Sequence, residues 1–351
     1  MSEGMVREGT KRCRKELSRE TPGDNRISNM ANDTEILLKV ENLTKHFPVS
    51  GGKVVHAVDD VSFSISKGKT LGLVGESGCG KSSCARTVIR IYDPNAGKII
   101  LDGEDITKLS QKQLLPHRRK MQMIFQDPYA SLNARMTVQD IVAEPLRAHH
   151  ICKSKAEERE MVADMLHQVG LNQEHAGRYA HEFSGGQRQR VGIARALILQ
   201  PKLVICDEPI SALDVSIQAQ VVNMLRTFQE EQGLTYLFIA HDLSMVRYVS
   251  DDVGVMYLGQ LVEKCETDEI YTHPLHPYTQ GLLSSVPIPN PELARKKEHA
   301  GIAGDIPSPI APPSGCRFHT RCPFAEERCR SEIPAFREAT PGHFVACHRV
   351  N

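Results

Sequence analysis

The sequence lacks any long uninterrupted apolar run. Spanning a bilayer takes about 18 to 20 consecutive apolar residues, and no stretch of the chain approaches that length. The N-terminus also lacks the short apolar stretch of a signal peptide. The formal net charge is zero, so the charge balance gives no support to a nucleic-acid partner. We therefore expect a soluble chain that works in the cytosol without nucleic acid.

Of the ten cysteines, four are clustered near the C-terminus, and these four lack the close C-x₂₋₄-C pairs typical of zinc fingers and ribbons. Six are scattered, and disulfides are their least expected use in a reducing cytosol. Four thiolates on loops suit a [4Fe–4S] cluster, whose cysteine spacings vary. Zinc and a metal-free set of packed thiols stay open as alternatives. The four clustered cysteines are Cys316, Cys322, Cys329 and Cys347, with His319, His343 and His348 nearby.

A length of 351 residues predicts about two domains. Residues 1–34 mix both charges without an apolar period, which is typical of a disordered tail, and Met30 is an alternative start. From residue 35 to about 270, short β-rich runs alternate with helical stretches, which predicts an α/β domain with a mainly parallel sheet. The clearest strands are at residues 70–75, 121–125, 203–207 and 235–240.

Two further regions differ in composition from this α/β pattern. Between the second and third strands, at residues from about 127 to 190, apolar residues recur at helical spacing. Val162, Met165 and Leu166 are examples. We expect a helical subdomain there. From residue 271 to 351 the proline content rises, so a separate, loop-rich C-terminal extension is expected to contain the four clustered cysteines.

The stretch GESGCGKSS follows the strand at residues 70–75 and opens a predicted helix near Lys81. It fits G-x-x-x-x-G-K-[ST] through Gly75, Gly80, Lys81 and Ser82. Glycines let successive backbone N–H groups point at phosphates, the lysine reaches the β- and γ-phosphates, and the serine hydroxyl binds Mg²⁺. The alternative, a simple glycine-rich turn, leaves the strand–turn–helix context unexplained.

Several polar residues follow predicted strands or open a predicted helix. Asp207 and Glu208 end an apolar strand, where they suit a Mg²⁺ ligand and a residue that polarises water, although Asp-Glu-Pro also starts helices. Gln126 and His241 end two further strands. Ser184, Gly185 and Gly186 precede a long helical run and could form a second anion site or a capped turn.

Taken in order, these motifs resemble the ATP-binding subunit of ABC transporters. The resemblance covers residues 35 to about 270 and implies a P-loop NTPase fold with an ATP-hydrolysing site. It assigns catalysis to Glu208, His241, Lys81 and Gln126, and Mg²⁺ to Ser82, Gln126 and Asp207. It assigns ATP binding to Phe47, Gly75, Ser77, Gly78, Cys79, Gly80, Lys81, Ser82, Ser83, Gln126, Ser184, Gly185, Gly186, Gln187, Asp207 and Asp214.

The resemblance also implies a head-to-tail dimer with a second, different ATP-binding subunit. In it, Ser184, Gly185 and Gly186 would act on the partner's nucleotide, and Asp214 would lie at the dimer interface. Phe47 would stack on adenine, although a Phe is more often part of a core. The loop after Gln126 and the helical subdomain would form the groove for a helix of a membrane subunit.

Longer stretches look like oligopeptide and dipeptide importers, with the F-type subunit slightly favoured over the D-type. They are QDPYASLNARMTV, VMYLGQLVE, HPLHPYTQGLL and GDIPSPIAPPSGCRFHTRC. Such importers add two membrane permease subunits and an extracytoplasmic binding protein, and some hold a [4Fe–4S] cluster in this extension. A peripheral place on the cytoplasmic face of the membrane follows. Import of nickel, glutathione or another small solute is the alternative, and a soluble, non-transport ABC ATPase is a second one.

Overall fold

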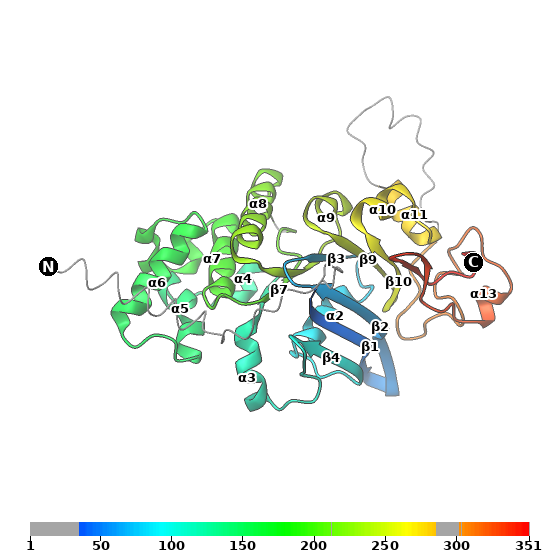
Figure 1. Cartoon of the computed structure of the whole chain (residues 1–351), viewed down its shortest axis with the longest axis horizontal. Helices are drawn as coiled ribbons and strands as arrows, with labels where there is room; N and C mark the ends of the chain where they lie inside the picture. The colour runs from blue at the N-terminus through cyan, green and yellow to red at the C-terminus, as the bar shows by residue number, and fades with distance from the viewer. Residues whose placement is uncertain (1–34, 212, 286–301, 303, 351) are drawn as a thin grey trace, which may run out of the picture. The chain divides into compact units, whose positions relative to one another are not determined.

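A computed structural model describes residues 35–211, 213–285, 302 and 304–350 (Figure 1). The expected N-terminal tail at residues 1–34, including the alternative start at Met30, lies outside the described residues. The chain divides into two compact units. Unit 1 contains Gln111–Leu234, and unit 2 contains Ile36–Ser110 together with the described residues from Thr235 onward. None of the helices in the described part of the chain is long and apolar enough to cross a membrane.

The main sheet of unit 2 is built around a fully buried strand, β3 (Thr70–Val74). It pairs in parallel with β8 (Thr235–Ile239) on one side and with β9 (Asp252–Tyr257) on the other. Because both faces of β3 are covered, its run TLGLV is apolar almost throughout. Beyond β9 the pairing becomes antiparallel through β10 (Gln260–Glu266).

A second sheet of unit 2 has the strand order β2-β1-β4-β5. Its first two strands form a long antiparallel hairpin, closed by a short 3₁₀ turn that contains Gly51 at φ 78°. The left-handed backbone at this turn favours glycine. The strands are β1 (Ile36–Val49), β2 (Lys53–Ser66), β4 (Ala96–Leu101) and β5 (Glu104–Asp105), and the turn is η1 (Ser50–Gly52).

Short helices complete unit 2. The first of them begins directly after Gly80, at Lys81, as the sequence predicts. Proline opens another at Pro277, where its fixed φ suits the first turn of a helix. The helices are α2 (Lys81–Val88), α9 (Leu243–Val249), α10 (Thr267–Thr272), α11 (Pro277–Ser284) and α13 (Arg328–Ser331).

The described part of the C-terminal extension belongs to unit 2 and adds to its sheet. Strand β12 (His343–Val345) pairs with β10, and β11 (Arg337–Thr340) pairs with β12. The carboxylate of Glu263 on β10 is fully buried and accepts hydrogen bonds from three groups of the extension. They are the backbone N–H groups of Leu275 and His276, at 2.6 and 3.0 Å, and His343 Nε2, at 2.8 Å.

Unit 1 joins two parallel strands to a group of helices (Figure 1, green). Its longer helices pack together, with α5 against α6 and α7. The unit extends on both sides of residues 127–190 because β6 and β7 pair within it. Its elements are α3 (Gln111–Lys120), β6 (Met121–Ile124), α4 (Pro128–Ser131), α5 (Val138–Ala148), α6 (Lys155–Gln168), η2 (Gln173–Gly177), η3 (Ala180–Glu182), α7 (Gly185–Leu197), β7 (Leu203–Asp207) and α8 (Val215–Gln232).

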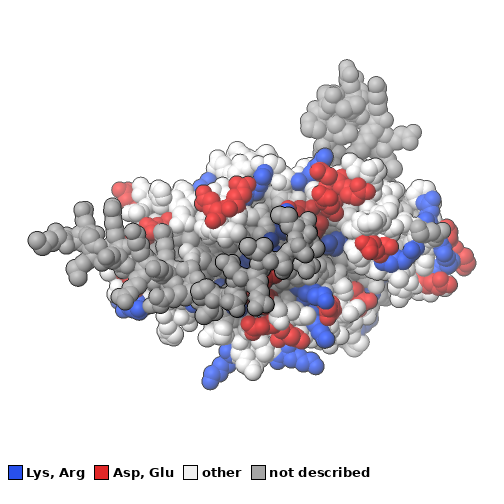
Figure 2. All heavy atoms as spheres, viewed as in Figure 1, with Lys and Arg blue, Asp and Glu red and all other residues white. Residues whose placement is uncertain are grey.

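The four strands predicted from apolar runs are confirmed as β3, β6, β7 and β8, with ends that agree to within one residue. The placement of charged side chains agrees with the zero net charge of the sequence. Figure 2 shows acidic and basic side chains interspersed over the visible surface of the described residues. Mixed charge of this kind is typical of an ordinary solvated surface.

Candidate functional site

The glycine-rich loop between β3 and α2 is shaped by backbone angles that other residues rarely adopt. Gly75 has φ 148° and Gly80 has φ 109°. A Cβ on Gly80 would lie 2.1 Å from the carbonyl oxygen of Ala57, so the loop passes too close to β2 for a side chain. Gly78, at φ 77°, faces open space. The loop is therefore curled, with its backbone free to approach a ligand closely.

Lys81 reaches back over this loop. Its side chain is only 4% exposed, and its Nζ donates to the carbonyl oxygens of Gly75 at 2.7 Å and Glu76 at 3.0 Å. The ammonium is therefore held against the loop that its motif assigns to phosphates. Cys79 is buried beside it, and burial raises the pKa of the Cys79 thiol, although the nearby lysine opposes this. Because this thiol is buried and neutral, we expect Cys79 to act in the site through its backbone.

The three serines of the motif lie at the loop and the start of α2. Ser77 is exposed on the loop, and Ser82 and Ser83 are half-buried in the first turn of the helix. Ser82 and Ser83 thus lie at the N-terminus of α2, where anions bind favourably. His241 follows β8 and is exposed. Because Leu73 and Ile239 pair in parallel, the chain leaves both strands at the same sheet edge, before the loop and before His241.

Phe47 lies near the end of β1 and is half-buried. Its ring meets that of Tyr92 edge-on, with centroids 5.1 Å apart, and Lys45 Nζ lies 4.9 Å from its centroid. Part of the ring stays open to solvent. A supported aromatic of this kind has a face available for stacking.

In unit 1, two strand-end residues contact each other directly. Strands β6 and β7 are parallel neighbours, with Ile124 opposite Cys206. As a result, Gln126 and Glu208 leave the same edge, and Gln126 Nε2 donates to Glu208 Oε2 at 2.7 Å. Glu208 has φ 46°, a left-handed conformation that is uncommon outside glycine and is found at functional sites. The preceding Asp207 is fully buried.

The start of α7 carries the second glycine motif. Ser184 is its N-cap and forms a capping box with Gln187, in which each side chain accepts from the other's backbone N–H. Ser184 N lies 3.1 Å from Gln187 Oε1, and Gln187 N lies 3.4 Å from Ser184 Oγ. A Cβ on Gly186 would approach Ile217 to 2.8 Å, so glycine permits close packing against α8 there.

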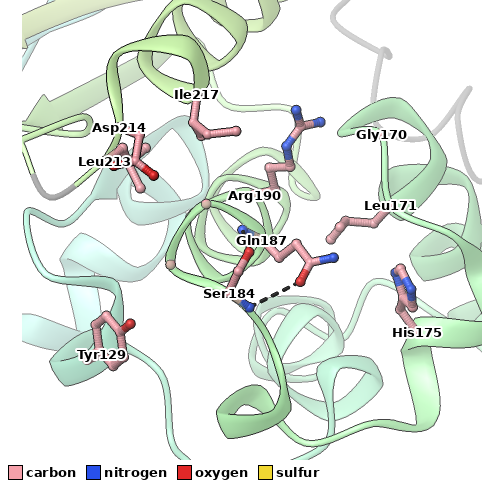
Figure 3. A pocket seen from close by; sticks show the side chains of 12 residues that line it. Tyr129, Gly170, Leu171, His175, Ser184, Gln187, Arg190, Leu213, Asp214 and Ile217 are labelled. Carbon is pink, nitrogen blue, oxygen red and sulfur yellow. Dashed lines mark hydrogen bonds between the residues drawn. The ribbon is translucent and has the colours of Figure 1, made fainter.

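These residues line a cavity of about 570 Å³ (Figure 3). Ser184, Gly185, Gly186, Gln187 and Asp214 all contribute to its wall, so the structure brings together residues that the sequence assigns to one interface. Asp214 is exposed at the start of α8 and makes no capping hydrogen bond. The wall also contains residues that sequence reasoning missed, namely Tyr129, Gly170, Leu171, His175, Arg190, Leu213 and Ile217.

Arg190 is held in that wall by two hydrogen bonds. Its Nη1 donates to the carbonyl oxygen of Val169 at 2.7 Å, and its Nη2 donates to Gln220 Oε1 at 2.8 Å. Tyr129, another residue of the wall, is covered by the guanidinium of Arg188, whose Cζ lies 4.0 Å from the centroid of the tyrosine ring. In the sequence, the one signal for these arginines is that Arg188 follows Ser184 by four positions and Arg190 follows Gly186 by four, since residues four apart share a helix face.

The four clustered cysteines lie close enough together to affect one another's protonation. The pKa of Cys316 is raised to about 11, mainly by burial and to a smaller extent by the other three thiols. Burial likewise raises the pKa of Cys322 and of Cys347. Backbone hydrogen bonds from Phe318, Phe324 and Arg349 oppose the rise in the pKa of Cys316, Cys322 and Cys347 respectively. The backbone of Cys316 is also bonded to that of Cys329, at 2.8 Å.

The nearby histidines are engaged elsewhere. His319 Nδ1 lies 2.8 Å from the carbonyl oxygen of Cys316, His348 Nε2 lies 3.0 Å from that of Glu332, and His343 contacts Glu263.

Comparison with known proteins identifies the class. The family described as "ABC transporter" matches residues 58–211, and the one described as "Oligopeptide/dipeptide transporter, C-terminal region" matches residues 262–329. A solved dimer of the ATP-binding cassette MJ0796 bound to ADP and Pi superposes with a TM-score of 0.61 at 27% identity. The match covers 66% of this chain and 99% of that one. The chain has the P-loop NTPase fold of an ABC ATPase.

Curated relatives narrow this class. The oligopeptide transport ATP-binding protein AppF of Bacillus subtilis is 55% identical, over 91% of this chain and 98% of the relative. The oligopeptide transport ATP-binding protein OppF of Haemophilus influenzae is 50% identical, over 92% of this chain and 99% of the relative. The chain belongs to the family of oligopeptide transport ATP-binding proteins, which are the ATP-binding subunits of oligopeptide and dipeptide ABC importers.

Proposed function

We propose that this protein hydrolyses ATP to ADP and phosphate and couples that reaction to the uptake of di- or oligopeptides. The family membership supports the reaction class and the cargo class. The observation that carries the catalytic assignment is the position of Glu208. Its carboxylate is anchored by Gln126 at 2.7 Å, and its backbone is left-handed at φ 46°. A carboxylate held in this way can orient the attacking water and accept its proton.

The remaining motif residues have roles in binding and positioning. The N–H groups of the loop from Gly75 to Gly80 and the Lys81 ammonium bind the phosphates, and Phe47 stacks on adenine. Ser82, Gln126 and Asp207 would hold Mg²⁺, and the ion would neutralise charge on the phosphates. His241 donates to the γ-phosphate. Positioning and electrostatic stabilisation thus supply most of the catalysis.

We further propose a head-to-tail dimer with a second, different ATP-binding subunit. The cavity of about 570 Å³ lined by Ser184, Gly185 and Asp214 receives the partner's nucleotide phosphates. The positive end of the α7 dipole and the nearby Arg190 give it the chemistry of an anion site. Each ATP then gains donors from both subunits, and hydrolysis removes those contacts and reopens the dimer.

The assembly we propose places this subunit peripherally on the cytoplasmic face of the membrane. It docks on two permease subunits, and an extracytoplasmic binding protein delivers the cargo. The chemistry of the cargo is set by those partners. Import of nickel, glutathione or another small solute is the alternative use of the same machinery.

The test of the proposed function compares Glu208→Gln with wild type in the assembled transporter. The amide keeps the shape of the side chain but cannot accept a proton, so ATP binding is retained. Steady-state hydrolysis falls by about 10²-fold or more, within the range of general-base catalysis. Glu231→Gln, at an exposed glutamate of the same unit, is the matched control and keeps full turnover. Unchanged turnover in Glu208→Gln would refute the assignment.

We also propose that the four clustered cysteines hold a [4Fe–4S] cluster. The support is the sequence spacing of the four thiols, which lacks the close pairs typical of zinc sites, together with their mutual electrostatic effect in the folded extension. N–H groups aimed at the sulfurs stabilise bound thiolates. Anoxically purified protein should contain about four iron and four sulfide per chain. Full zinc occupancy without sulfide would reverse this assignment.

A further inference from the structure

The phosphate loop is held by two residues of the C-terminal extension. Both contacts converge on Glu76, the residue after Gly75. Its carboxylate receives a bidentate pair of hydrogen bonds from Arg321, at 2.7 and 3.0 Å. Its backbone N–H donates to the hydroxyl oxygen of Tyr278 at 2.9 Å. The main chain and side chain of this loop residue are thus both bonded to residues more than 200 positions later in the sequence.

The environment of Arg321 restricts the guanidinium to this position. Its side chain is 5% exposed, against 23% for that of Glu76. Behind it, Tyr257, Tyr278 and Phe318 form an aromatic cluster, with ring centroids 4.7 to 5.3 Å apart. Arg321 Nη1 also lies 3.5 Å from the Tyr257 hydroxyl. Well-packed walls leave a bidentate guanidinium little freedom to swing away.

The charge of Glu76 explains why such a partner is needed. A carboxylate within a loop that binds phosphates places negative charge beside a negatively charged ligand. At short range and partial burial, this repulsion is substantial. Arg321 neutralises that carboxylate from a buried position through two hydrogen bonds.

We propose that Arg321 is a positioning residue of the nucleotide site, which neutralises Glu76 and fixes the phosphate loop through it. The extension is therefore part of the ATP site rather than an appendage to it. This inference rests on the proposed function, since it assumes that the loop binds ATP. If Arg321 were purely structural, its variants would bind ATP poorly whichever residue stood at position 76. In the proposed role, the defect comes from the unpaired charge of Glu76 alone.

The test is a set of fluorescent ATP titrations on the full chain. Arg321→Gln, which removes the charge and keeps a hydrogen-bonding side chain, should raise the Kd for ATP by about fivefold or more, as typical coupling between sites does. Arg321→Ala should do the same or more. The second substitution Glu76→Gln, made in either variant, should bring the Kd back to within about twofold of Glu76→Gln alone.

Arg330→Ala is the matched control. Arg330 is an exposed arginine of the same extension, whose nearest ionic partner, Glu327, lies 4.0 Å away. It should bind ATP as wild type does. The inference is overturned if Arg321→Gln binds like wild type, or if Glu76→Gln fails to rescue it. Failure of the wild-type chain to bind ATP would instead refute the proposed function, and the inference with it.

Discussion

His276 gives the fold a pH dependence that can be worked out from its surroundings. The side chain is only 1% exposed, and its Nδ1 accepts the backbone N–H of Tyr278 at 3.0 Å, which caps α11. Burial lowers the pKa of His276 from its ordinary 6.5 to about 4, although the nearby Glu263 opposes this. The ring is therefore neutral when folded, and a proton on Nδ1 would break the cap.

The sign and size of the effect follow from these two pKa values. Between pH 6.5 and 4 the unfolded chain binds the proton and the folded chain does not, so the free energy of unfolding falls as the pH falls. Above pH 6.5 the contribution is fully present. For this single group the loss between pH 7 and pH 5 is about 2 kcal/mol.

The perturbation that isolates this group is His276→Asn. Asparagine keeps an oxygen acceptor at a helix N-cap, where it is among the preferred residues, and does not titrate. Urea unfolding followed by circular dichroism at pH 7 and pH 5 measures the result. The variant should lose about 2 kcal/mol less than wild type between the two pH values. The control His273→Asn removes an exposed histidine nearby and should lose as much as wild type. Equal losses in His276→Asn and wild type would refute the reasoning.

Two further predictions concern the glycine motifs. Gly80→Ala should weaken ATP binding about tenfold or more in a titration, because the new Cβ would lie 2.1 Å from the Ala57 carbonyl oxygen. Gly78→Ala, where the same Cβ meets open space, should weaken it less, and equal losses would contradict the steric account. Ser184→Ala removes a capping box and should lower the free energy of unfolding by about 1 kcal/mol. It should leave ATP binding by the isolated chain unchanged but reduce hydrolysis in the assembled transporter, and a normal rate there would count against the proposed partner site.

Much of the core architecture could be predicted from the sequence because its signals are local. An apolar run such as Leu203–Asp207 is buried on both faces, and the structure places a strand on that range. The phosphate loop was predictable because its glycines and Lys81 occupy a fixed spacing between a strand and a helix. Strand pairing then brought Gln126 beside Glu208, a contact between residues 82 positions apart.

The extension was harder to predict, for physical reasons. Its strand β12 has three residues, too few to show an alternating pattern. The burial of Glu263 depends on three donors from distant positions, and no local property of a glutamate indicates it. The pairing of Glu76 with Arg321 has the same character, since the sequence alone does not distinguish Arg321 from the other arginines as its partner. Charge pairs carry no periodicity, so only the folded backbone selects them.

The distance along the chain between Glu76 and Arg321 has a consequence for biosynthesis. The two residues are 245 positions apart, which at about 5 to 20 residues per second corresponds to roughly 12 to 50 s of translation. Throughout that interval the nascent phosphate loop is complete in sequence but lacks its arginine. A chain released early, at a premature stop codon, would carry every nucleotide motif with the Glu76 charge uncovered. With the proposed role of Arg321, the nucleotide site is completed only after residue 321 has been translated, which links its maturation to translation of the extension.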